Sequence, residues 1–175
     1  YSFNTVNGSL VINKVQVTVT ADPFTKPYDA KTTSGFSSKF AGFVNGENES
    51  VVIGTINYTG TAPTAVAVGT AAIVPDVSAL TATNYTFAAS SSPLVITKAV
   101  LTVAANNVTK TYDGKAYTSF TRSITGFINN DTENVVSGMT TYSGTAMTAT
   151  QAGSYSVTPI VSGLSSPNYI FTAVS

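Results

Sequence analysis

The chain has 175 residues with eight basic and eight acidic side chains, so its formal net charge is zero, and it has neither cysteine nor histidine. Disulfides and thiol chemistry are therefore excluded, and zinc and copper sites nearly so. We expect no nucleic-acid partner, because phosphates require a basic surface. No apolar run approaches the ~20 residues that cross a membrane, so we also expect no membrane insertion.

The first element in chain order is a hairpin predicted for residues 1–13. Asn7-Gly8 separates two runs of strand-forming residues there, and this dipeptide favours a tight hairpin turn. Residues 15–20 (VQVTVT) alternate valine with polar residues, which predicts a strand with one buried face. Further strands are predicted in KFAGFV, VVIGTINYTG, VGTAAIVPDV and NYTFAA. The stretch GENESVV predicts one helical turn with Asn45 as its N-cap.

The same elements recur when the chain is shifted by 84 residues. Lys14 of LVINK then aligns with Lys98 of LVITK, and the alignment continues without a gap. Within it, NDTENVV repeats the helical turn, capped by Asp131 and Thr132. We predict a first repeat at residues 14–97 and a second at residues 98–175 whose last strand is missing. Residues 1–13 align with the end of the first repeat and are interpreted as the tail of a preceding one.

The fold class predicted is all-β, with two tandem small modules of the β-sandwich type and six to eight strands in each. An immunoglobulin-like and a β-grasp-like module with one short helical turn both remain open. The junction VINKVQV has no flexible spacer, so an elongated arrangement is expected. Tyr155 and Val157 show the inward-facing rhythm of a sandwich strand. The predicted core residues are Val15, Val17, Val19, Phe43, Val51, Tyr58 and Phe87, with Leu101, Val103, Phe127, Val135, Tyr142 and Phe171 in the second repeat.

A polar cluster occurs once in each repeat, in FTKPYDAKTTS and VTKTYDGKAYT. If the cluster is a functional site, Asp29 and Asp113 are acids or metal ligands, with Glu49 and Glu133 as second carboxylates. If the cluster is a structural turn, each Asp accepts hydrogen bonds from the backbone that follows it, and glycine supplies a positive φ. We favour this second interpretation, although Ala30 stands where glycine is expected. The motif residues are Lys26, Tyr28, Asp29 and Lys31, and Lys110, Tyr112, Asp113 and Gly114.

Two further kinds of site have the right residue types. Calcium needs several oxygen ligands, and the second repeat has only three acids. We therefore expect no cofactor and keep calcium as an alternative. A lysine–asparagine isopeptide bond aided by a carboxylate is the other alternative, against asparagines that simply stabilise turns. Its candidates are Lys14, Asn84 and Glu49, and Lys98, Asn168 and Glu133.

The segments YSFNTVNGSLVINK, LTVAANNVTKTYDGK, GFINNDTENVVSG and SSPNYIFTA resemble the YDG and MBG ("mostly beta, glycine-rich") repeats of bacterial surface proteins. The hallmark K-x-Y-D-G is complete at Lys110–Gly114. The resemblance implies an extracellular, cell-surface or secreted segment of an adhesin or exoprotein, active in cell adhesion and biofilm. It carries no catalytic residue, so a non-enzymatic stalk that projects a distal binding region is expected.

The nearest partners of such a stalk are adjacent repeats of the same chain. The alternative is that the repeats themselves bind a carbohydrate or a matrix protein of the host, since exposed tyrosines stack on sugars. Most of the tyrosines recur at fixed strand positions, which is more typical of core or half-buried rings.

Overall fold

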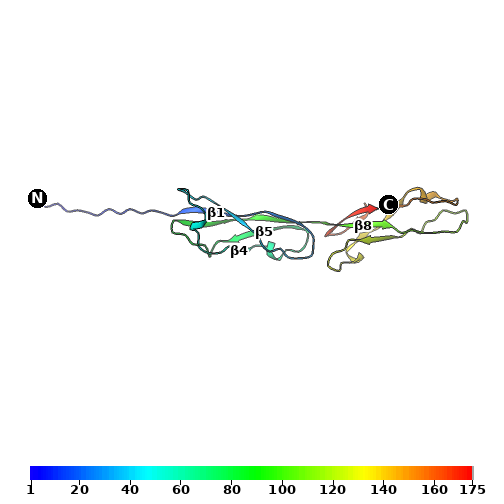
Figure 1. Ribbon diagram of the computed structural model, residues 1–175, viewed down its shortest axis with the longest axis horizontal. Helices are drawn as coiled ribbons and strands as arrows, with labels where there is room; N and C mark the ends of the chain where they lie inside the picture. The colour runs from blue at the N-terminus through cyan, green and yellow to red at the C-terminus, as the bar shows by residue number, and fades with distance from the viewer. Residues whose placement is uncertain (175) are drawn as a thin grey trace. The chain divides into compact units, whose positions relative to one another are not determined.

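The computed structural model of the chain describes residues 1–174 and confirms the all-β prediction (Figure 1). Residues 15–97 contain β1 (Val15–Ala21), β2 (Phe24–Pro27), β3 (Ser38–Ala41), β4 (Asn57–Thr59), β5 (Gly69–Asp76), β6 (Tyr85–Ser90) and β7 (Ser92–Thr97). Residues 99–174 contain β8 (Ala99–Ala105), β9 (Arg122–Thr125), β10 (Ser137–Gly138), β11 (Thr141–Ser143), β12 (Thr158–Ile160), β13 (Leu164–Ser165) and β14 (Tyr169–Val174). Helical structure in residues 1–174 is limited to short 3-10 turns: η1 (Glu49–Val51), η2 (Ala62–Thr64), η3 (Glu133–Val135) and η4 (Thr145–Thr148).

Each repeat has the same three-stranded main sheet. In the first repeat β1 is the central strand, antiparallel to β3 and parallel to β6, with Val17 opposite Phe87. In the second repeat β8 takes the central place between β9 and β14, with Leu101 opposite Phe171. The strands that come first and last along the chain, β1 and β6 or β8 and β14, are therefore parallel neighbours in this sheet. The sheet is mixed rather than purely antiparallel.

The other strands of the two repeats differ. In the first repeat they form a four-stranded sheet in the order β2-β7-β5-β4. In the second repeat β11 pairs with β12 and β10 with β13, each as a separate two-stranded ladder. The β4–β5 and β11–β12 ladders correspond to each other, because Tyr58 lies opposite Pro75 and Tyr142 opposite Pro159.

The alternating valines predict the core strands correctly. Val17 and Val19 of β1 are fully buried, as are Leu101 and Val103 of β8. Val15 was expected in the core but is exposed, because it is the first residue of β1 and precedes the buried stretch of that strand. The other predicted members are half-buried in both repeats. Tyr85 and Tyr169, whose fixed strand positions indicate core or half-buried rings, are nearly fully buried. The fully buried Leu94 and the nearly buried Ile96 lie outside the predicted core.

Both helical turns form where the sequence predicts them, as η1 and η3. Thr132 is the N-cap of η3, as expected, and its hydroxyl accepts from the backbone N–H of Asn134. The predicted cap Asn45 is wrong: Asn48 caps η1 by accepting from Ser50, and Asn45 instead has a positive φ of 57°. A single asparagine-rich loop offers both residues, so composition alone does not distinguish the cap from the turn.

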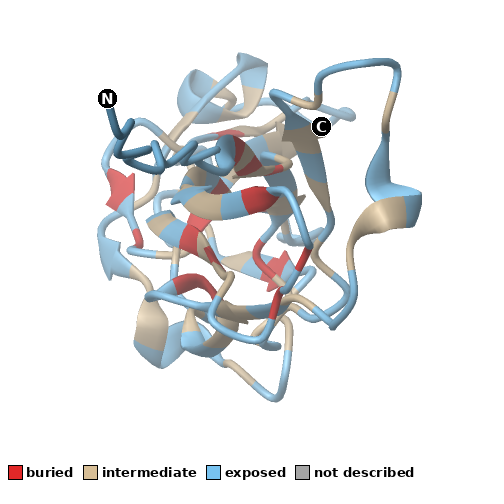
Figure 2. Cartoon of the chain, turned by 90° about the vertical axis from the view of Figure 1, so that its left-hand side faces the viewer, coloured by how far each residue is buried: buried red, intermediate tan, exposed pale blue. Residues whose placement is uncertain are grey.

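Residues 1–14 contain no strand, whereas the Asn7-Gly8 pair predicts a hairpin there. All of these residues are exposed, as the pale blue N-terminal segment in Figure 2 shows. A two-stranded hairpin is only marginally stable without a third strand or a core to cover. The aligned strand β6 is held by β1, and the N-terminal segment has no corresponding partner among the described residues.

The chain forms two compact units. The first comprises Tyr1–Phe24, Thr33–Thr64 and Ala71–Leu94, and the second comprises Thr25–Thr32, Ala65–Thr70 and Val95–Ser175. Two loops of the first repeat thus belong to the second unit. In the part of the chain that the structure describes, no helix is long and apolar enough to cross a membrane.

Candidate functional site

The first polar cluster forms a closed turn in the loop Thr25–Thr32. The Lys26 ammonium donates to Asp29 Oδ1 at 2.8 Å and to the Lys31 carbonyl oxygen at 2.6 Å. The backbone N–H of Lys31 also donates to Asp29 Oδ1, at 3.0 Å. Ala30 between them adopts the left-handed region, with φ at 56°. The lysine, the aspartate and two backbone groups therefore hold one another inside this turn.

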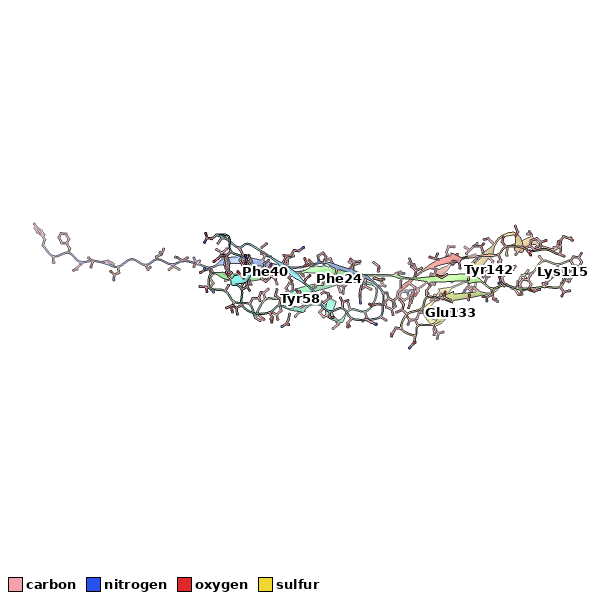
Figure 3. All side chains as sticks on the ribbon, in the orientation of Figure 1. Phe24, Phe40, Tyr58, Lys115, Glu133 and Tyr142 are labelled. Atoms are coloured by element: carbon pink, nitrogen blue, oxygen red, sulfur yellow. The ribbon has the colours of Figure 1, made fainter. Side chains whose placement is uncertain are left out.

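The second cluster repeats this turn with the same contacts. The Lys110 ammonium pairs with Asp113 Oδ1 and donates to the Lys115 carbonyl at 2.8 Å. The Lys115 N–H, on the loop labelled in Figure 3, donates to Asp113 Oδ1 at 2.9 Å. Gly114 has φ at 72°, the region that glycine enters without strain. The missing glycine of the first repeat therefore does not change the turn.

Both aspartates are ionised hydrogen-bond acceptors. The hydrogen bond from Lys26 is the main reason that the pKa of Asp29 lies below its usual value, and the N–H of Lys31 adds to it. Lys110 and Lys115 lower the pKa of Asp113 in the same way. A general acid requires the opposite shift, since it must keep its proton near neutral pH. The lowered pKa values thus suit aspartates that accept hydrogen bonds within the turn, and they do not suit a general acid.

Tyr28, next to the first turn, is buried within the second compact unit and only 8% exposed. Its ring meets Tyr169 edge to face, with ring centroids 5.5 Å apart. The hydroxyls of Tyr28 and Tyr169 both donate to Asp131 Oδ2, at 3.3 and 2.7 Å. Burial is the main cause that raises the pKa of both phenols, that of Tyr169 to about 12. We call these three residues the tyrosine–aspartate cluster.

The first repeat has its own version of half of this cluster. Tyr85, the counterpart of Tyr169, is buried and donates to the Glu47 carboxylate. Tyr85 accepts a hydrogen bond from the Val44 N–H at 3.2 Å, just as Tyr169 accepts one from Ile128 at 3.0 Å. A buried tyrosine bound to a carboxylate and a loop N–H is therefore a feature of both repeats. The sequence does not identify Asp131 and Tyr169 as partners of Tyr28. The alignment shifted by 84 residues does place Asp131 opposite Glu47 and Tyr169 opposite Tyr85.

Tyr112, the counterpart of Tyr28, is in a different environment. It is 65% exposed and borders a hollow of about 540 Å³ between residues 106–120 and residues 146–157. Tyr155, expected to face inward from a strand, is also exposed at this hollow and lies in no strand. The same motif tyrosine is thus buried in one repeat and open in the other.

The isopeptide candidates have other partners among the described residues. The Lys14 ammonium donates to the Ala82 carbonyl at 2.8 Å. Its counterpart Lys98 donates to the Ser166 carbonyl at 2.7 Å. Both lysines thus hold the loop that precedes the last main-sheet strand, two residues before Asn84 and Asn168.

Two of the remaining members of those sets, Asn168 and Glu133, also have hydrogen-bond partners. Asn168 Oδ1 accepts from the Val68 N–H at 3.2 Å, inside the second unit. Glu133, labelled in Figure 3, pairs with Arg122 at 2.9 Å, and Glu49 is exposed in η1. Residues 1–174 contain no group of three acidic or other metal-binding side chains that could hold an ion.

Comparison with known families agrees with the duplicated architecture. The family described as MBG domain (YGX type) matches the chain twice, at residues 17–95 and 101–175. The chain belongs to the MBG domain family. The resemblance drawn from the Y-D-x-K loops is thereby confirmed. Neither a curated protein nor a solved structure matches the chain.

The two MBG domains share the turn and the buried tyrosine, and they differ in what surrounds the Tyr28 and Tyr112 positions. A loop of the first MBG domain supplies Tyr28 to the compact unit that contains the second. The described contacts of the motif residues are those of a docking element, in which the turn holds the loop and the tyrosine is inserted.

Proposed function

We propose that the chain is a non-enzymatic structural segment of a bacterial cell-surface adhesin or secreted exoprotein. Its tandem MBG domains form a stalk that projects a distal binding region away from the cell. The observation that carries this proposal is the tyrosine–aspartate cluster, in which Tyr28 from one MBG domain packs on Tyr169 of the next. A side chain shared in this way limits bending at the joint, which is the property that a stalk requires.

The extracellular location is part of this proposal and is supported by the resemblance to repeats of bacterial surface proteins. Charged residues are only 9% of the chain, and its solubility rests on serine, threonine and asparagine. No cofactor is proposed, because the carboxylates that the motif supplies are already bound to lysines and to backbone N–H groups.

The stalk proposal is tested by small-angle X-ray scattering on chains with two, three and four MBG domains. The expected result is a maximum dimension that increases by a constant increment for each added domain. Tyr28→Ala should broaden the distance distribution of the two-domain chain by loosening the joint. Tyr112→Ala is the matched control, since that ring is already exposed. A compact particle whose dimension hardly grows with domain number would contradict the proposal.

A second candidate function is carbohydrate binding by the MBG domains themselves. The observation that favours it is the hollow bordered by the exposed rings of Tyr112 and Tyr155, since aromatic rings stack on sugars. A glycan array separates the two candidates. No binding to any glycan on the array supports the stalk. Binding to particular saccharides that Tyr112→Ala and Tyr155→Ala abolish supports the binding module.

A further inference from the structure

Two tyrosine rings meet in the tyrosine–aspartate cluster. The ring centroids of Tyr28 and Tyr169 are 5.5 Å apart, and the ring planes stand at 82° to each other. Both hydroxyls donate to one oxygen, Asp131 Oδ2, so the phenolic ends of the two rings converge on the same point. The ring carbons next to each hydroxyl-bearing carbon lie at these ends. The carbons through which phenols couple are therefore brought towards each other.

This contact differs from the other aromatic contacts of residues 1–174. Each of the others includes a phenylalanine, as where Tyr85 meets Phe43 with ring centroids 5.2 Å apart. Phenylalanine has no hydroxyl and resists one-electron oxidation, whereas tyrosine is among the most easily oxidised side chains. Within the described residues, Tyr28 and Tyr169 are thus the place where two oxidisable rings touch.

Asp131 is placed as the base that such an oxidation requires. A phenol that loses an electron becomes very acidic, so its proton must pass to a neighbouring acceptor at the same time. Burial disfavours the phenolate and raises the pKa of both tyrosines, which closes the route through a phenolate formed beforehand. Asp131 accepts hydrogen bonds from both phenols and is only half-buried, so it can pass protons on to water.

We propose that Tyr28 and Tyr169 form an oxidative cross-linking site, at which a one-electron oxidant of the peroxidase type joins the two rings as dityrosine. Each phenol gives one electron to the oxidant and its proton to Asp131, which passes the proton to water. The two phenoxyl radicals combine in a carbon–carbon bond between their ortho carbons. The hydrogen atom on each of these carbons then moves to the oxygen of the same ring, which restores both phenols. One molecule of hydrogen peroxide takes up the two electrons and two protons and becomes two molecules of water.

The burial of the two rings favours this product over other products. Tyr28 is 8% exposed and Tyr169 is 1% exposed, so neither radical meets a tyrosine of another molecule. The oxidant does not need to touch the rings, because an electron crosses a short stretch of protein without direct contact. The radicals therefore couple with each other, within one chain.

The product is a covalent bond between residue 28 of one MBG domain and residue 169 of the next. The chain has no cysteine, so a disulfide cannot provide such a bond. A cross-link between distant residues lowers the entropy of the unfolded chain and thereby stabilises the folded state. This inference goes beyond the stalk and does not depend on it, since the chemistry requires only the tyrosine–aspartate cluster.

The first test exposes the dilute 175-residue chain to a haem peroxidase and hydrogen peroxide and identifies cross-linked peptides by mass spectrometry after proteolysis. The expected product joins the peptides that contain Tyr28 and Tyr169, has two hydrogen atoms fewer than their sum, and shows dityrosine fluorescence. Tyr28→Phe should abolish this product, whereas Tyr112→Phe, which removes an exposed phenol, should leave it unchanged. Absence of the Tyr28–Tyr169 product, whether or not the exposed Tyr112 and Tyr155 become cross-linked, overturns the proposal.

A second test asks whether Asp131 acts as the base. Asp131→Asn keeps the size of the side chain and a hydrogen-bond acceptor but removes the carboxylate, and it should slow formation of the product about 100-fold. Asp131→Glu should recover most of the rate, because Glu47 binds the equivalent tyrosine in the first repeat. The N–H of Tyr28, which donates to the Thr97 carbonyl at 2.8 Å, should stay protected from hydrogen exchange in both variants. Equal rates in the original chain and the Asn variant, or equal slowing in the Asn and Glu variants, would contradict the assigned step.

These results are independent of the scattering test of the stalk. The cross-link is identified from peptide masses, whereas the stalk is judged from how the maximum dimension grows with domain number. A cross-link in a compact particle would support this proposal and contradict the stalk. An elongated particle without the cross-link would do the reverse.

Discussion

The two MBG domains can be compared within one molecule, because two sequences that align without a gap fold in different surroundings. Their main sheets agree strand for strand and in register: Val15 lies opposite Tyr85, and Ala99 lies opposite Tyr169. Their second sheets do not agree, since β5 has eight residues and its counterpart β12 has three. The two aligned segments differ in sequence, GTAAIVPD and GSYSVTPI, and β5 is paired on both sides, with β7 and β4. A segment with strand propensity needs partners for its backbone N–H and C=O groups before it is stable as a strand.

The largest effect is expected when the first domain is deprived of its β7 contacts. Leu94→Ala removes a fully buried side chain and should lower the free energy of unfolding by about 2–5 kcal/mol. Amides of residues 24–27 and 69–73 should also lose protection from hydrogen exchange, so that the first domain comes to resemble the second. Val95→Ala, at a half-buried neighbour, is the control and should cost less. Unchanged protection in residues 69–73 would break the argument that β7 maintains β5.

The next effect concerns the motif tyrosines, which have the same sequence context but opposite burial. Tyr28→Ala removes a buried ring and its hydrogen bond to Asp131, and should cost about 2–4 kcal/mol. Tyr112→Ala removes an exposed ring and should change the stability by no more than about 0.5 kcal/mol. Chemical denaturation of both variants measures the difference. Equal losses would show that the burial of Tyr28 contributes nothing.

The sequence was sufficient to predict the duplication, the main-sheet strands and the helical turns, because these depend on residues close together or on simple alternation. Val17 and Val19 alternate with polar residues, and this pattern correctly predicts that they belong to the core. The Y-D-x-K turn follows from the local hydrogen bonding of Asp29 and Asp113, which needs no distant residue.

Apart from the cap of η1 and the exposed Val15, the failures involve residues whose environment depends on a distant segment. Tyr155 alternates with Val157 like a core strand, but its strand partner is absent from the described residues, so its ring is exposed. Asn7-Gly8 has the chemistry of a hairpin turn, but residues 1–14 pair with no strand among the described residues. The burial of Tyr28 depends on Asp131, which is 103 residues away along the chain. Neither the periodicity nor the composition of the sequence predicts a contact between residues so far apart along the chain.

A further prediction concerns high pH. The folded protein holds the pKa of Tyr169 at about 12, above its ordinary value of 10.0, because burial and Asp131 disfavour the phenolate. A raised pKa stabilises the fold fully below pH 10, and this contribution is lost as the pH rises from 10 to 12. The melting temperature should therefore fall over this range.

Tyr169→Phe supplies the control for the titration. It removes the ionisable group together with its hydrogen bonds to Asp131 and Ile128, so it should lower the melting temperature at neutral pH. It should also flatten the fall between pH 10 and 12, which differential scanning fluorimetry would record. If the variant loses stability over that range as steeply as the original chain, the tyrosine–aspartate cluster is not the group that titrates.

The smallest effect compares Ala30 with Gly114, the two residues that occupy the same place in the two turns. Both have a positive φ, 56° and 72°, and the left-handed region costs alanine roughly 1–2 kcal/mol. Ala30→Gly should therefore raise the stability, by less than about 1 kcal/mol once the greater chain entropy of glycine is subtracted. Gly114→Ala should lower it by about 1 kcal/mol, and steric contact plays no part because a Cβ there meets nothing within 4 Å. Since Asp29 and Asp113 make the same hydrogen bonds, the opposite signs isolate the backbone conformation; a change of the same sign in both variants would mean that the two turns are not equivalent after all.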